Sequence, residues 1–163
     1  MDTRSWPEPV ERVTAFLRDA AGEVRVEEFA DGTPTAQAAA RAVGCELGQI
    51  VKSLVFLCDS RPVLVLVPGD RRADSAKVAR AAGSRSARIA GPEEVTAATG
   101  FEPGAVAPFP VPRVERVFID GTLLSHRVVW IGAGSDRHMA ALSPAELVRL
   151  SRARPMDVVE SHT

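Results

Sequence analysis

The sequence predicts an α/β protein of the mixed α+β class, in which helices pack on one mixed β-sheet, and three observations lead to this expectation. Short apolar segments such as 49–59 and 61–70 alternate or run together as strands do. Segments with helical spacing lie between them and begin at capping residues. Hairpin connections are mixed with helical crossovers along the chain, which is typical of a sheet with both antiparallel and parallel neighbours.

Local signals define the elements of the first half. Ser5 and Glu8 have the spacing of a capping box ahead of an apolar helical stripe. Thr33 is expected to cap a second helix, with Pro34 at its first position and Gly44 as its stop. We expect, in order, a helix at 5–20, a strand at 23–30, a helix at 31–44 and two strands at 49–59 and 61–70 joined by a short turn.

The second half has equally clear signals. Asp74 is a helix cap, and Gly100 follows the end of another helix. Four prolines within residues 101–112 exclude regular structure there. Ser143 and Glu146 form a second capping box. We expect helices at 73–83, 91–100 and 143–153, strands at 113–120 and 127–134, and a loose tail from about Arg154.

Composition narrows the class of protein. The 163 residues are expected to form a single domain, 1–163, with its core at about 5–152 and a C-terminal tail at about 154–163. The net charge of −1 gives no bulk basic field for DNA or RNA, so an RNA contact needs a local patch. Two cysteines are too few for a disulfide framework, and no apolar run reaches membrane-spanning length. A cytoplasmic protein is therefore expected.

Lys52 is the first candidate for a functional residue. Side chains of a strand alternate between faces, so Lys52 shares a face with Leu54 and Phe56. An ammonium group among apolar side chains is costly unless something compensates it. Lys52 is either a lysine whose head reaches water from a strand end, or one aimed into a cleft that binds an anion or a polarised carbonyl.

Two glycine-containing segments are further candidates. The loop from Gly104 to Pro108 is either an ordinary surface loop or a stiffened segment whose backbone N–H groups meet a ligand. The turn containing Gly132 and Gly134 is either a hairpin turn with an exposed His138, or a backbone pocket with His138 as donor or base.

Other chemistries find no support in the sequence. Three histidines and two cysteines show no metal-ligand spacing, and there is neither a P-loop nor a serine-nucleophile motif. Lys77 and Arg80 follow the segment GDRR as a small basic cluster, which is either a solvated surface or a phosphate contact. No cofactor and no metal are expected.

The order of these motifs resembles a known family. The segments IVKSLVFLCDSRPVLVLVPGDRRADSAKVARAAG, EEVTAATGFEPGAVAPFPVP and VFIDGTLLSHRVVWIGAGSDRHMAALSPAEL together are similar to the YbaK/ProX family over residues 23–152. Its members are free-standing relatives of the editing domain of bacterial prolyl-tRNA synthetase. The resemblance implies a curved central sheet and hydrolysis of the ester between a wrong amino acid, alanine or cysteine, and proline tRNA. The acceptor end of an aminoacyl-tRNA is the implied partner, and prolyl-tRNA synthetase a second one.

The resemblance also implies roles for individual residues. Lys52, Gly104 and His138 match the catalytic positions, with His138 typical of the alanine-editing branch. Five residues match substrate-binding positions: Ser53, where the family usually has threonine, Pro108, Asp120, Gly132 and Gly134. Water, or a substrate group such as the ribose 2′-hydroxyl, is the implied nucleophile.

Two other classes of function stay open at this point. A tRNA-binding or nucleotide-binding module could keep the fold without hydrolysis. An ester hydrolase for small molecules is also compatible with motifs that address only the ester. Lys52, the Gly104–Pro108 loop and His138 favour the deacylase.

Overall fold

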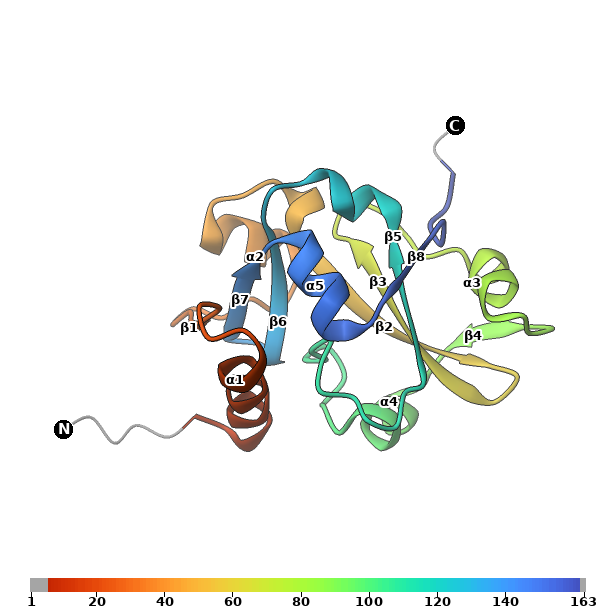
Figure 1. Cartoon of the computed structure of the whole chain (residues 1–163), viewed down its shortest axis with the longest axis horizontal. Coiled ribbons are helices and arrows are strands. Elements are labelled where there is room, and N and C mark those ends of the chain that lie inside the picture. The colour runs from red at the N-terminus through yellow and green to blue at the C-terminus, as the bar shows by residue number, and fades with distance from the viewer. Residues whose placement is uncertain (1–5, 162–163) are drawn as a thin grey trace.

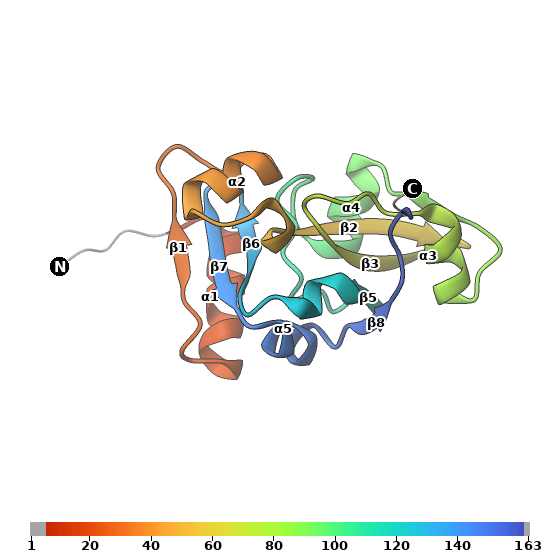
Figure 2. The same cartoon turned by 90° about the horizontal axis from the view of Figure 1, so that it is seen from above.

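The computed structural model describes residues 6–161, in which two β-sheets lie side by side and helices cover them (Figures 1 and 2). The helices of the described chain are α1 Glu8–Ala20, α2 Ala36–Val43, α3 Ser75–Ala82, α4 Pro92–Thr99 and α5 Pro144–Ser151, with short 3-10 helices η1 Leu47–Gln49 and η2 Gly121–Ser125. The strands are β1 Val26–Glu28, β2 Val51–Cys58, β3 Arg61–Pro68, β4 Ala87–Ile89, β5 Arg116–Asp120, β6 Val129–Ser135, β7 His138–Leu142 and β8 Arg154–Met156.

The larger sheet has the order β4-β2-β3-β5-β8 and is mixed, as predicted. The expectation of a single sheet is wrong, because β1, β7 and β6 pair with one another in a second sheet. β2 pairs antiparallel with β3 and β4, whereas β3–β5 and β5–β8 are parallel pairs. Asp59 and Ser60 form the two-residue turn between β2 and β3, both with positive φ, as this kind of tight hairpin requires.

The smaller sheet has the antiparallel order β1-β7-β6. It meets the larger sheet through one parallel bridge between Ile50 and Trp130. The two sheets therefore meet at the start of β2, near the predicted functional lysine.

The largest hydrophobic core joins both sheets. Val13 and Leu17 of α1, with Leu147 of α5, pack against the sheet residues Leu64 and Ile131. A second core lies on the other face of the larger sheet, where Val78 of α3 belongs to one buried cluster with Val65 and Phe118. Alternate residues of β3 belong to the two cores, because successive side chains of a strand point to opposite faces. β3 is therefore apolar on both faces. Within residues 6–161, no helix is both long enough and apolar enough to span a bilayer.

Several sequence-based expectations of helix ends are confirmed. The Asp74 carboxylate accepts from the N–H groups of Ala76 and Lys77, and Ser143 accepts from the N–H of Glu146. The other half of the predicted capping box is replaced, because the Glu146 carboxylate binds Arg149. Gly100 ends α4 in the left-handed conformation. The predicted capping box of the first helix depends on Ser5, which lies outside the described residues.

Three expectations about the elements are corrected. The cap of α2 is Thr35, whose side chain accepts from the N–H of Ala38, whereas the Thr33 hydroxyl donates to the Asp136 carbonyl. The residues after Arg154 are not a loose tail, because β8 pairs with β5 and Val158 is buried. Strands β4 and β7 have no counterpart among the expected elements; β7 is the partner that makes β6 part of a hairpin.

Candidate functional site

A cavity of about 310 Å³ lies where the two sheets meet, and we call it the junction pocket. It is lined by Thr33–Ala36 and Ala39 around the start of α2, Ile50–Leu54 at the start of β2, Gly104–Val106 of the proline-rich loop, and Gly132, Ser135 and Met139 of the β6–β7 hairpin. Segments far apart in the sequence thus bring Lys52, Ser53, Gly104 and Gly132 to one place. These are four of the eight predicted site residues.

Lys52 is half-buried in the junction pocket, and its Nζ donates a hydrogen bond of 2.6 Å to the Arg71 carbonyl oxygen. This hydrogen bond offsets part of the free-energy cost of placing the ammonium group among apolar side chains. Burial lowers the pKa of Lys52; the nearby charge of Arg72 lowers it further, while Asp70 acts in the opposite direction. A partly desolvated cation with spare donors is suited to binding an anion or a carbonyl oxygen.

Gly104 belongs to a tight turn beside the junction pocket. The Ala105 N–H donates to the Glu102 carbonyl at 2.9 Å, and Gly104 has φ +81°. A proline at the second position and a positive-φ glycine at the third are typical of a type II turn. The Ala105 N–H is therefore already engaged within the turn, and Gly104 supplies a backbone conformation that other residues rarely adopt.

The two glycines of β6 have different surroundings. Gly132 lines the junction pocket, and an added Cβ would lie 3.5 Å from the Val106 carbonyl oxygen. Gly134 lies outside the pocket lining, and an added Cβ would lie 2.8 Å from the backbone of Pro9. Gly134 therefore allows the start of α1 to approach the hairpin closely.

The structure does not bring His138 into the junction pocket. Met139 lines the pocket, and because neighbouring residues of a strand point to opposite faces, His138 points away from it. His138 is 2 % exposed, and the ring of Trp6 lies edge-on against it. Its Nδ1 is 2.6 Å from Ser135 Oγ, and its Nε2 is 3.6 Å from a carboxylate oxygen of Glu28. His138 thus reaches the pocket only through Ser135.

The burial of His138 predicts a pH dependence of stability. Burial lowers the pKa of His138, with a smaller opposing effect of Glu28. As the pH falls below the ordinary histidine value of about 6.5, the unfolded chain takes up a proton that the folded protein resists. We expect the free energy of urea unfolding to fall by up to about 1.4 kcal/mol per pH unit, until the lowered pKa is reached.

A matched pair of variants tests this expectation. The His138→Gln variant should lose this part of the pH dependence between about pH 7.5 and about pH 5.5. The His126→Gln variant retains His138 and should keep it. An unchanged slope in His138→Gln would contradict the prediction.

Two other predicted substrate-binding residues lie away from the junction pocket. Asp120 ends β5, where its carboxylate accepts from the N–H of Thr122 and from the N–H of Val158 at 3.4 Å. It lines a separate cavity that also contains Lys77. Pro108 is buried and is absent from the pocket lining. The Asp120 carboxylate therefore has hydrogen-bond partners within the chain, at the end of β5.

The pocket lining also contains polar groups that the sequence analysis did not single out. Ser135 lines the pocket, with its Oγ held by His138 and by the N–H of Arg137. Thr35, the cap of α2, lines it as well. Ser53, predicted from the resemblance, has a buried Oγ that finds no hydrogen-bond partner among residues 6–161. The hairpin pairing that brings Ser135 to His138 could have been found by recognising a second strand after the glycine turn.

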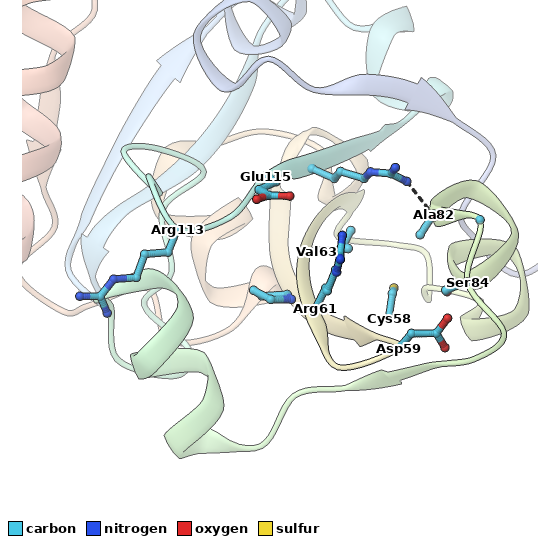
Figure 3. Close-up of a pocket in the computed structure, with 11 residues that line it drawn as sticks. Cys58, Asp59, Arg61, Val63, Ala82, Ser84, Arg113 and Glu115 are labelled. Atoms are coloured by element: carbon cyan, nitrogen blue, oxygen red, sulfur yellow. Dashed lines mark hydrogen bonds between the residues drawn. The ribbon is translucent and has the colours of Figure 1, made fainter.

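A larger cavity of about 760 Å³ lies at the opposite end of the β2–β3 hairpin (Figure 3). Its charged side chains include Arg61 and Glu115, while Arg113 extends away from the others and donates to the Ala97 carbonyl. The Arg116 guanidinium donates to the Ala82 carbonyl. None of the predicted site residues lines this cavity. Arg113 and Arg116 both bind backbone carbonyls of the chain itself.

Comparison with known proteins identifies the family. The sequence model of the aminoacyl-tRNA editing domain matches residues 30–150. The chain is 34% identical over 127 residues to YwhH of Bacillus subtilis, covering 77% of this chain and 80% of YwhH. It is 36% identical over 114 residues to a proline–tRNA ligase of Nitratidesulfovibrio vulgaris strain DP4, covering 69% of this chain but only 20% of the ligase.

A solved structure gives the same answer for the fold. A crystal structure described as a candidate trans-editing enzyme for prolyl-tRNA synthetase superimposes with a TM-score of 0.90 and 38% identity, covering 96% of this chain and 100% of that one. The predicted fold class is therefore confirmed down to the family. The protein belongs to the family of aminoacyl-tRNA editing domains, the YbaK-type deacylases that its motifs resemble.

Proposed function

We propose that the protein is a trans-editing hydrolase that removes a small wrong amino acid, alanine or cysteine, from proline tRNA. The observation that supports this most is the junction pocket, which joins Lys52, Ser53, Gly104 and Gly132 from segments far apart in the sequence. Membership of the editing-domain family supports the reaction class, deacylation of an aminoacyl-tRNA. The acceptor end of the tRNA is the proposed partner, and prolyl-tRNA synthetase would supply the mischarged substrate.

The proposed chemistry uses charge and backbone rather than a protein nucleophile. The ammonium of Lys52 would bind the terminal phosphate or the ester carbonyl, where its positive charge stabilises developing negative charge. Water, oriented by the ribose 2′-hydroxyl, would attack the ester carbon. The bond from this carbon to the ribose oxygen breaks, the amino acid leaves as a carboxylic acid, and the ribose oxygen takes up the proton of the attacking water. Ser135 and His138 would act as positioning residues that fix the pocket wall.

The proposed selectivity rests on size. Gly104, Ala105 and Gly132 give part of the pocket wall short side chains. The volume of about 310 Å³ is at the lower end of the range for ligand pockets, about 300–1,000 Å³. An apolar pocket discriminates by only about 1–3 kcal/mol per methylene group, so exclusion of larger residues is expected to be steric.

Incubation of the purified protein with a panel of mischarged tRNAs tests the proposal. We expect alanyl-tRNA and cysteinyl-tRNA of the proline acceptor to lose their amino acid, and correctly charged prolyl-tRNA to be spared. Binding of these tRNAs without hydrolysis would indicate a non-catalytic tRNA-binding module instead. Hydrolysis of simple amino-acid esters with no effect on any aminoacyl-tRNA would indicate a small-molecule esterase.

A further inference from the structure

The outer edge of β2 carries backbone groups that face the junction pocket. In an antiparallel strand, alternate residues direct both their N–H and C=O to the same neighbour. Gly69 N–H, at the end of β3, donates to the Ile50 carbonyl, so even-numbered residues of β2 face β3. Ala90 N–H donates to the Val55 carbonyl on the other side, so odd-numbered residues face outwards. Ser53 therefore directs its N–H and C=O to the outer edge.

No strand of residues 6–161 pairs with this part of the outer edge. The ladder of β4 with β2 covers only Phe56–Cys58, and the smaller sheet pairs on this side only through the bridge between Ile50, just before β2, and Trp130. Lys52–Leu54, which lie between the bridge and the β4 ladder, line the junction pocket. The Ser53 Oγ, buried and without a partner in the described chain, lies at the same position.

We propose that this edge binds the aminoacyl group of the substrate as a strand of one residue. The Ser53 carbonyl accepts a hydrogen bond from the α-ammonium group, and the Ser53 N–H donates to the ester carbonyl oxygen. This inference rests on the proposed function and adds a substrate requirement: the ester must carry a free α-amino group. An aminoacyl ester carries its donor and acceptor one Cα apart, as a residue of a neighbouring antiparallel strand does.

The other polar side chains of the pocket are less suited than the Ser53 carbonyl to accept a hydrogen bond from the α-ammonium group. The lining contains Lys52 and no acidic side chain, so no carboxylate is present there to pair with an ammonium. Each of the other three hydroxyls of the lining has a partner: Thr33 donates to the Asp136 carbonyl, Thr35 accepts from the N–H of Ala38, and Ser135 is held by His138. A carbonyl oxygen on an unpaired strand edge is then the best-placed acceptor.

A series of three tRNA esters with the same carbon skeleton tests the requirement. Alanyl-tRNA has an α-ammonium, lactyl-tRNA an α-hydroxyl, and propionyl-tRNA neither. After each rate is divided by the uncatalysed rate of the same ester, we expect propionyl-tRNA to react about 10- to 100-fold more slowly than alanyl-tRNA, with lactyl-tRNA between them. Equal corrected rates for alanyl- and propionyl-tRNA would overturn the inference while leaving the deacylase function intact.

A binding experiment tests the contact itself and does not depend on turnover. The probe is 3′-alanylamino-3′-deoxyadenosine, in which an amide replaces the labile ester. We expect the Ser53 amide to shift in the nitrogen–proton spectrum and to exchange its hydrogen more slowly on binding. The Leu54 amide, which faces β3, is the internal control and should keep its exchange rate. Absence of binding, or equal effects on both amides, would overturn the proposal.

Discussion

The Lys52→Ala variant is expected to lose deacylation by about a hundredfold or more while remaining folded, because one preorganised charge contact in a cleft is worth roughly 3 kcal/mol of transition-state stabilisation. The fold should tolerate the change, since the side chain is only half-buried and makes one hydrogen bond, to the Arg71 carbonyl. The measurement is single-turnover hydrolysis of mischarged tRNA, together with the thermal unfolding midpoint.

Two variants separate charge from packing in this experiment. The Lys52→Met variant keeps most of the apolar stem and removes the charge, so it should be as inactive as Lys52→Ala. The Lys77→Met variant removes a second partly buried lysine that binds Asp157 and the Val159 carbonyl away from the junction pocket. It should lose stability and keep activity. Full activity in Lys52→Met would show that the ammonium is not used.

The sequence predicts the position of Lys52 on a strand of the β2–β3 hairpin well because the signals are local. A lysine in an apolar strand is visible without any knowledge of tertiary contacts, and the β2–β3 hairpin follows from two apolar runs and a short turn. The caps Asp74 and Ser143 are local in the same sense, because each side chain bonds to N–H groups two or three residues on.

The predicted site residues that do not line the junction pocket are held in place by contacts between distant segments. The direction of His138 is set by the strand parity of β7 and by the irregular pairing between Gly132 and Ser135, which no periodicity in the sequence reveals. Asp120 is held by Val158, a residue of the segment predicted to be a loose tail. That segment is ordered because β5 offers it a parallel edge, and the N–H of Asp74 donates to the Val158 carbonyl.

The prediction for Gly104 combines a local signal with a contact that the sequence does not reveal. It gives the second large expected effect. The sequence EPGA has a local turn signal, yet the resemblance suggests a ligand-binding loop. In the structure Gly104 has φ +81°, and an added Cβ would meet no atom within 4 Å. The glycine is therefore required for its backbone conformation rather than for space within the protein. Any substrate that fills the junction pocket would occupy part of that open space.

The Gly104→Val variant is expected to lose deacylation by about a hundredfold, because a β-branched residue is forced out of the left-handed region and the turn must reshape the pocket wall. Stability should fall by roughly 1–2 kcal/mol, the cost of the left-handed conformation for a residue with a Cβ. Binding of uncharged tRNA should be largely spared, since the acceptor stem lies outside the pocket. Hydrolysis rates and tRNA affinity, measured on the same preparation, check both expectations.

The Gly104→Asn variant decides why Gly104 matters. Asparagine adopts the left-handed conformation more readily than other residues with a Cβ, so the turn should keep its shape and most of its stability. If only the turn is needed, Gly104→Asn should retain much of the activity that Gly104→Val loses. If the backbone at Gly104 approaches the substrate closely, the asparagine side chain must intrude and both variants should be inactive. Full activity in both variants would remove the Gly104–Pro108 loop from the site and leave Lys52 and the edge of β2 as its remaining parts.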